Sequence, residues 1–186
     1  MRRTDSFPRE RPLTMICAAD SLLQIRPLDD NKLLACAGPI GDTVAFGEYV
    51  SGHVALYNLR HDIKLSTSAT ASWVRANLAH ALRTGPFQVN MLLGGVDANK
   101  KPSLYFIDYL ASCHPMKFAA HGYGANFVLS TLDRFYRPDM DKEEAMKVME
   151  KCIYEIRTRF LINTPRFQLK IVTADGVEVI NPAFSS

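Results

Sequence analysis

Hydrophobic residues recur along this chain with two periods, which separate expected strands from expected helices. Nearly continuous apolar runs at 33–38 and 87–93 predict buried strands, because a strand covered on both faces carries apolar side chains at successive positions. Apolar residues three or four positions apart predict helices at about 43–60, 67–83 and 125–136, and a fourth that ends near residue 160. The apolar faces comprise Val50, Val54 and Tyr57; Val74, Leu78, Ala81 and Leu82; Phe127, Val128, Leu132, Phe135 and Tyr136; and Ala145, Val148, Met149, Cys152, Ile156 and Phe160.

Polar residues predict where these helices begin. Asp42 is the expected N-cap of the first helix, and either Ser66 or Ser68 is that of the second, since their side-chain oxygens accept hydrogen bonds from first-turn backbone N–H groups. Asp141 and Glu144 have the spacing of a capping box, with aspartate in place of serine or threonine. We therefore expect the fourth helix to begin just after Asp141.

The segment from Pro102 to Asp139 combines strands, a glycine-rich turn and a helix. A strand at 103–111 is expected to return antiparallel to the preceding strand, and a short strand is expected at 116–120. His121-Gly122-Tyr123-Gly124 follows directly. Two glycines flanking one residue, between a strand and a helix, indicate backbone that turns tightly or approaches another surface closely.

The end of the chain predicts a hairpin. Apolar stretches at 167–172 and 177–180 flank Asp175-Gly176, a pair typical of tight hairpin turns. Lys170 lies between Leu169 and Ile171, which is the alternation expected of a half-exposed edge strand.

The order of the predicted elements indicates an α+β fold. Helices occur in pairs and strands in hairpins, so the alternation of strand and helix that builds a parallel sheet is absent. Two helix layers outside two antiparallel sheets fit this order. The 186 residues fit one domain, which we place at 13–186, preceded by a polar, flexible or unrelated segment at 1–12.

Composition and charge narrow the classes of function that fit this chain. A net charge of +3 with 22% charged residues gives no basic face of the kind that nucleic acids require. No apolar run approaches the roughly 18 residues of a membrane span. We therefore expect a soluble intracellular protein without nucleic-acid or membrane partners. The four cysteines form no C-x-x-C pair, which favours buried reduced thiols over zinc ligands or disulfides; they are Cys17, Cys36, Cys113 and Cys152.

Several long runs of the chain carry a family resemblance: LDDNKLLACAGPIGD (28–42), FGEYV (46–50), NLAHALRTGPFQVNMLLGG (77–95), SLYFIDYLAS (103–112), AAHGYGANFVLSTLDRFYRPDM (119–140) and KCIYEIRTRFLINTPRFQLKIV (151–172). In this order and spacing they resemble the beta subunits of the 20S proteasome, in particular those of the beta-4 ring position. The resemblance covers about 28–180. It implies the four-layer α-β-β-α sandwich of N-terminal nucleophile hydrolases, and assembly with other beta and alpha subunits into a seven-membered ring within a stack of four. It further implies ubiquitin-dependent protein degradation in the cytoplasm and nucleus.

The resemblance also indicates that this chain is not catalytic. Active members use an N-terminal threonine whose α-amino group serves as base, tuned by a lysine and an aspartate and supported by an Asp-x-x-Ser-Gly element. Here Gln24 precedes Ile25 where the lysine is expected, and 162–165 read Ile-Asn-Thr-Pro. Asp20 matches the aspartate, and Thr4 lies sixteen residues before it, but neither the residues before nor those after Thr4 fit the pattern. We expect no catalytic residues, cofactor or metal; an active threonine-type amidase is the alternative.

Three polar groups are candidates for other chemistry. Cys113 and His114 are adjacent, and adjacent side chains of a strand point to opposite faces and cannot pair, so we expect a core thiol and a loop histidine. His61-Asp62 has the position of a helix C-terminal cap, where a protonated histidine is favourable. His121 is expected to make a hydrogen bond that fixes its turn or contacts a neighbouring subunit. The methionines at 146 and 149 are expected in the core or an interface.

The N-terminal region departs from the resemblance. Asp20 and Gln24 are four residues apart, whereas about twenty residues separate the corresponding positions in relatives. Either Leu13 to Ala19 is the second strand of the fold with the next hairpin deleted, or residues 1–20 are unrelated sequence. Under either hypothesis, part of the strands of one sheet is missing. This suggests a shortened product, such as a splice variant or a mis-joined gene model. Interfaces are expected at the terminal strand and at the helices flanking 121–124.

Overall fold

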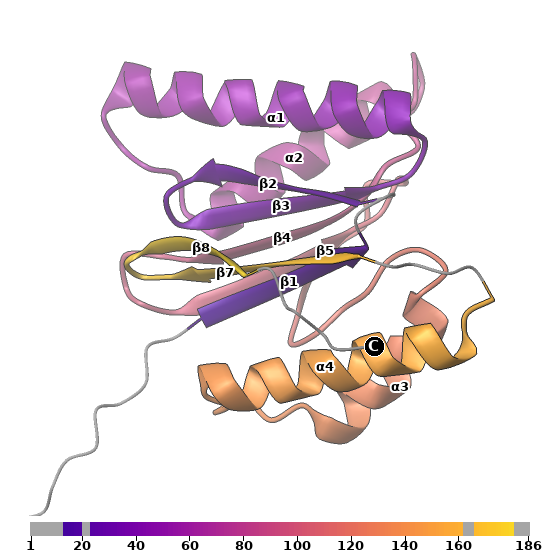
Figure 1. The fold of residues 1–186 in the computed structure, drawn as a ribbon. Helices are drawn as coiled ribbons and strands as arrows, with labels where there is room; N and C mark the ends of the chain where they lie inside the picture. The colour runs from indigo at the N-terminus through magenta and orange to yellow at the C-terminus, as the bar shows by residue number, and fades with distance from the viewer. Residues whose placement is uncertain (1–12, 20–22, 162–165, 181–186) are drawn as a thin grey trace, which may run out of the picture.

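Two antiparallel sheets are stacked between two pairs of helices in the computed structural model, which describes residues 13–19, 23–161 and 166–180. Figure 1 shows α1 and α2 on one side of the sheets and α3 and α4 on the other. The strands are β1 (Leu13–Ala19), β2 (Leu23–Asp29), β3 (Lys32–Ala37), β4 (Asn90–Val96), β5 (Pro102–Ile107), β6 (Cys113–Met116), β7 (Phe167–Thr173) and β8 (Gly176–Ile180); the helices are α1 (Ile40–His61), α2 (Thr67–Ala81), α3 (Ala125–Phe135) and α4 (Lys142–Arg159). The predicted α+β sandwich is confirmed.

The larger sheet has the strand order β2-β3-β4-β5-β6, and the smaller has the order β1-β7-β8. All neighbouring strands pair antiparallel. Strand β3 is buried at every position, as its continuous apolar run predicts, because it lies inside its sheet with a covered layer on each face.

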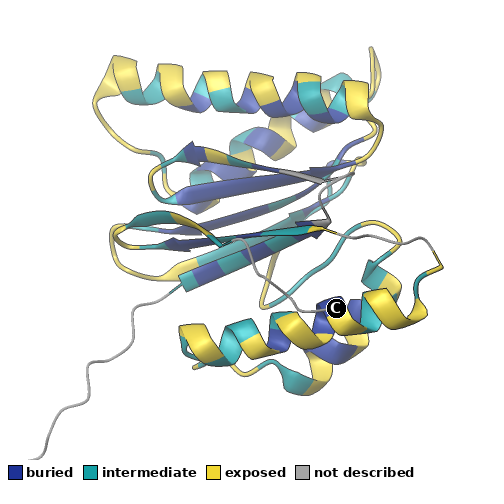
Figure 2. Cartoon of the chain, viewed as in Figure 1, coloured by how far each residue is buried: buried dark blue, intermediate teal, exposed yellow. Residues whose placement is uncertain are grey.

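Three apolar clusters fill the spaces between the layers, and Figure 2 shows the buried residues gathered on the facing surfaces. The first lies between α1, α2 and the larger sheet and includes Phe46, Val54 and Val74. The second lies between the sheets, around Ile16 and Leu33. The third joins α3 to α4 and is made by Val128, Leu132, Val148 and Cys152.

Helix caps were largely predictable from local sequence. The Ser66 hydroxyl accepts a hydrogen bond from the Ala69 N–H at 3.1 Å, which decides between the two serines considered for α2. Both bonds of the capping box between Asp141 and Glu144 are present at the start of α4. The prediction for α1 is wrong: Pro39 is the N-cap, and Asp42 lies in the first turn. Its carboxylate instead accepts from the Gln88 N–H at 2.9 Å, a residue distant in sequence.

Two strand boundaries near the glycine-rich turn also differ from prediction. Strand β5 ends at Ile107 rather than at 111, because Asp108 begins a tight turn in which Ala111 has a φ of 63°. The Asp108 carboxylate accepts from the Ser112 N–H at 2.7 Å and closes that turn. The expected strand at 116–120 is wrong; the strand that pairs with β5 is β6, which ends at Met116.

The C-terminal hairpin is confirmed, but its place in the sheet is not the one predicted. Strands β7 and β8 pair around Asp175-Gly176. Strand β7 is central rather than an edge, because β1 pairs along its other side, with Leu13 opposite Thr173. Lys170 therefore does not lie on an edge strand; its ammonium donates to the Ile25 carbonyl at 2.6 Å, and burial lowers its pKa.

A candidate cavity and its surroundings

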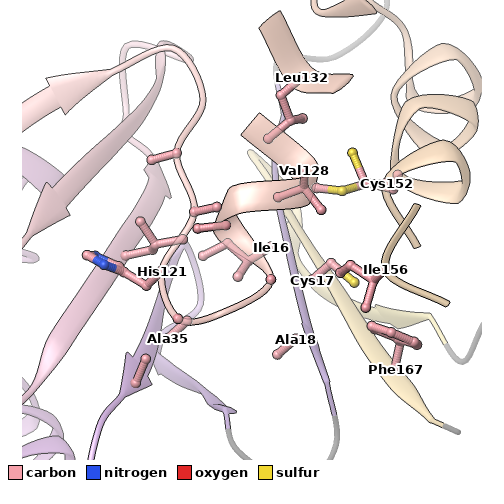
Figure 3. A pocket seen from close by; sticks show the side chains of 18 of the residues that line it. Ile16, Cys17, Ala18, Ala35, His121, Val128, Leu132, Cys152, Ile156 and Phe167 are labelled. Atoms are coloured by element: carbon pink, nitrogen blue, oxygen red, sulfur yellow. The ribbon is translucent and has the colours of Figure 1, made fainter. Parts of the chain in front are cut away.

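A cavity of about 510 Å³ lies between β1, the larger sheet, the 119–124 segment and helices α3 and α4. Figure 3 shows side chains from these separate parts of the chain meeting around it. Ligand cavities of proteins commonly have volumes of about 300–1,000 Å³ and mostly apolar walls. The lining includes Met15, Ile16, Cys17, Ala18, Ala35, Ala37, Leu92, Leu104, Val128, Leu132, Met149, Cys152, Ile156 and Phe167, together with His121 and the glycines that flank Tyr123.

Two thiols line this cavity, and both are held in their neutral form. Burial, with a smaller contribution from the neighbouring Cys152, raises the pKa of Cys17 to about 12. Burial, and then Glu155, raise the pKa of Cys152 to about 11. Because the thiolate is the reactive form of cysteine, neither residue has the character of a nucleophile. Burial also raises the pKa of Cys36 to about 12. All four cysteines are free, and Cys17 and Cys113 are only partly buried.

His121 anchors the glycine-rich turn to the larger sheet. Its Nε2 atom lies 3.0 Å from the Met91 carbonyl oxygen, and its ring stacks on Phe106 with 4.1 Å between the ring centroids. The predicted hydrogen bond is therefore confirmed, and its partner lies on β4. Burial lowers the pKa of His121, against smaller opposing effects of its hydrogen bonds and of Asp108.

Lowering the pH through the range in which His121 becomes protonated is expected to destabilise the protein. The folded state keeps His121 neutral below 6.5, the ordinary pKa, whereas the unfolded state protonates near it. The unfolded state then binds more protons, so stability is lost as the pH falls from about 6.5 toward the lower folded-state pKa. His121→Gln is expected to reduce the difference between urea midpoints measured at about pH 7.5 and about pH 5. His80→Gln, at an exposed position of α2, is the control; an equal effect of both changes would contradict the prediction.

The other two polar pairs follow the prediction except at His114, which lies on strand β6 rather than in a loop. Cys113 and His114 are adjacent on β6; Cys113 packs against the core beneath α1 and α2, while His114 is exposed, with Nε2 2.9 Å from the Ser112 hydroxyl oxygen. His61 is the last residue of α1, and Asp62 is its C-cap in the left-handed region. The methionines at 146 and 149 are half-buried on α4, and the second lines the cavity.

A buried charge pair was not predicted from the sequence. The Lys32 ammonium, which has no exposed surface, donates to the Asp29 carboxylate at 2.7 Å and to the Asn31 side-chain oxygen at 2.8 Å. The available signal was a lysine at the head of an otherwise apolar strand, two residues after a pair of aspartates. A lysine is buried only when paired, so this arrangement requires an acidic partner nearby.

The described part of the chain offers neither a cluster of metal ligands nor a membrane-spanning helix. Across residues 13–19, 23–161 and 166–180, no group of three or more His, Cys, Asp or Glu side chains is placed to hold a metal ion. Within the same ranges, no helix has the length and apolar character needed to cross a membrane.

Comparison with known proteins identifies the family. Residues 11–172 match the model of a family described as proteasome subunit. The chain belongs to the proteasome subunit family. It is 50% identical over 153 residues to proteasome subunit beta type-2-B of Arabidopsis thaliana, an alignment that covers 82% of this chain and 77% of that relative. It is 40% identical over 173 residues to probable proteasome subunit beta type-4 of Schizosaccharomyces pombe, covering 92% of this chain and 88% of the relative.

A third relative gives the same assignment. Proteasome subunit beta type-4 of Saccharomyces cerevisiae is 40% identical over 164 residues, which cover 87% of this chain and 83% of that subunit. These three relatives of this proteasome subunit are thus beta subunits named type-2 or type-4, which agrees with the resemblance found in its sequence.

The positions compared with the catalytic centre of active proteasome subunits are only partly described by the structure. Gln24 lies on β2, where its backbone pairs with Cys36 of β3, and the neighbouring Ile25 is buried. Thr4, Asp20 and the 162–165 stretch lie outside the described residues. The expectation of a non-catalytic chain therefore stays a prediction, as do the domain limits and the hypothesis of a shortened product.

Proposed function

We propose that this proteasome beta subunit is a non-catalytic, structural part of the core particle, which contributes ring contacts and chamber wall. The observation that carries the proposal is Gln24, which precedes Ile25 where active members carry a lysine. A neutral amide cannot supply the positive charge that tunes the terminal threonine amine. Its partners are other beta and alpha subunits, and its role belongs to ubiquitin-dependent degradation in the cytoplasm and nucleus.

Exposed apolar side chains support a role in assembly. Leu56 and Leu59 are three residues apart, so they share one face of α1, and Leu59 is 83% exposed. Tyr123, beside the glycine-rich turn, and Tyr154 of α4 are exposed as well. Val179 of β8 adds an exposed apolar residue on the terminal strand. Aromatic and aliphatic residues of this kind are typical anchors of protein interfaces.

An assembly experiment tests the proposal. An affinity-tagged full chain is expressed in eukaryotic cells, and native mass spectrometry is expected to find it in particles together with other beta and alpha subunits. Leu59→Asp is expected to reduce the incorporated fraction, because it places a charge in the proposed contact. Lys64→Asp, a charge change at a side chain that is 55% exposed beyond the end of α1, is the control. Recovery of the chain only as a free monomer would contradict the structural role.

A catalytic test addresses the alternative of an active threonine-type amidase. Purified chain, alone and in particles, is assayed with fluorogenic peptides after its N-terminus has been sequenced. We expect no turnover that depends on a threonine of this chain. A processed N-terminal threonine, with turnover lost in Thr4→Ala, would overturn the non-catalytic assignment.

A further inference from the structure

The cavity runs along the edge of strand β1 rather than across one of its faces. Four consecutive residues of β1, from Met15 to Ala18, line it. Successive side chains of a strand point to opposite faces, so four neighbours can border one cavity only if it follows the strand edge. Ile16 and Ala18 belong to the core between the sheets, whereas Cys17 lies toward Cys152 of α4.

Along that edge, no strand of the described residues pairs with the backbone of β1. Among the described strands, β1 pairs only with β7, and the order β1-β7-β8 places it at the end of its sheet. In an antiparallel sheet, alternate residues direct their N–H and C=O groups away from the paired neighbour. The outward groups of β1 therefore face the cavity, where a further strand could bond to them.

Two apolar walls bound the space beside this edge. Ala35, Leu92 and Leu104 of the larger sheet form one wall. Val128 and Leu132 of α3, with Ile156 of α4, form the opposite wall, as Figure 3 shows for the labelled residues. A backbone edge between two apolar layers is the environment of a central strand. The edge bordered by four residues extends about 13 Å, at roughly 3.3 Å per residue.

We propose that this cavity accepts an extended, uncharged apolar segment of a separate polypeptide, which adds as a strand to β1. Among the described residues, the lining contains no aspartate, glutamate, lysine or arginine, so a charged guest would lose its hydration without gaining a partner there. Alanines at 18, 35 and 37 leave room for aliphatic side chains of the guest. Main-chain hydrogen bonds would supply affinity, and the two walls would select alternate side chains.

The chain's own first twelve residues do not match this chemistry. They include four arginines, Asp5 and Glu10, so any four consecutive residues of this segment would bring at least one charge into the cavity. They also include Pro8 and Pro12, which lack the N–H group that strand pairing uses. The inference concerns the isolated full chain and does not depend on the proposed function.

Binding is tested with a defined peptide. The probe is fluorescein-labelled Lys-Thr-Val-Ala-Val-Ala-Val-Thr-Lys, whose lysines remain outside the cavity. Its control has proline in place of the central valine, which removes one N–H donor and blocks pairing. A second control is the 1–12 sequence of this chain. Fluorescence anisotropy with the full chain is expected to show saturable binding of the probe, and at least about tenfold weaker binding of both controls.

The location of binding is read from the cysteines. The probe is expected to slow modification of Cys17 and Cys152 by methyl methanethiosulfonate, because both thiols line the cavity. Cys113 is partly buried and does not line the cavity, so the probe is expected to leave its rate of modification unchanged. Hydrogen exchange of the β1 amides is expected to slow in the presence of the probe but not of the proline peptide.

A variant that fills the space completes the test. Cys17→Phe is expected to weaken probe binding at least about tenfold, since its ring would occupy the cavity. Ser130→Phe adds the same ring at an exposed position of α3 and is expected to leave binding unchanged. The proposal is overturned if the probe does not bind at about 1 mM, if the proline peptide binds equally well, or if bound probe leaves β1 exchange and both cavity thiols unaffected.

Discussion

Replacing Lys32 with methionine is expected to lower the free energy of unfolding by about 3–5 kcal/mol. The Lys32 ammonium is fully buried, and the Asp29 carboxylate with which it pairs is 7% exposed. Methionine fills a similar volume, so the change removes the charge while preserving most of the packing. The remaining carboxylate is then buried without its cation, which is the costly outcome. Urea denaturation, followed by tryptophan fluorescence, measures the effect.

The chain offers a matched control for this charge pair. Lys64 and Asp30 form a second lysine–aspartate pair at the same distance of 2.7 Å, but both side chains are largely exposed. Water solvates each partner when the other is removed, so Lys64→Met is expected to have little effect on stability. The double change Lys32→Met with Asp29→Asn should recover part of the loss, because it removes the unpaired charge. Equal effects of Lys32→Met and Lys64→Met would refute the assigned role.

Gly38→Ala is expected to destabilise the protein by about 2–4 kcal/mol. Gly38 joins β3 to α1 with a φ of 150°, a backbone conformation that side-chain-bearing residues rarely adopt. A Cβ atom there would lie 2.2 Å from the Gln88 carbonyl oxygen, which is backbone and cannot rotate away. Either α1 or the segment that precedes β4 must move to relieve this contact. Urea and thermal denaturation measure the loss.

Gly52→Ala is the control with the opposite expected sign. Gly52 lies inside α1, and a Cβ atom there would meet no neighbouring atom within 4 Å. Alanine in a helix interior is more favourable than glycine by roughly 0.5–1 kcal/mol, so this variant should be slightly more stable. If Gly38→Ala proved as stable as Gly52→Ala, the close approach of β3 and β4 at this point would be wrong.

Local chemistry explains which features were predictable. A capping box joins residues three positions apart, and the Asp175-Gly176 hairpin joins neighbouring strands, so each is encoded within a few residues. Helical periodicity likewise predicts one apolar face for each helix. Helix α3 confirms this, because Val128 and Leu132 are buried. His121 was predictable only in part. The glycines near it in the sequence indicated the turn, but its hydrogen-bond partner Met91 could not be predicted, because thirty residues separate the two.

By itself, the sequence determined the layered α+β fold and the family, because the periods of its apolar residues and its long runs are properties of the linear chain. Only the tertiary structure decided that β7 is central, since β1 reaches it from about 160 residues away and no local pattern records that pairing. It alone decided that Asp42 bonds to Gln88 instead of capping α1. The cavity beside β1 is also tertiary, because its walls come from the two sheets and from helices α3 and α4, and the space exists only where these layers meet.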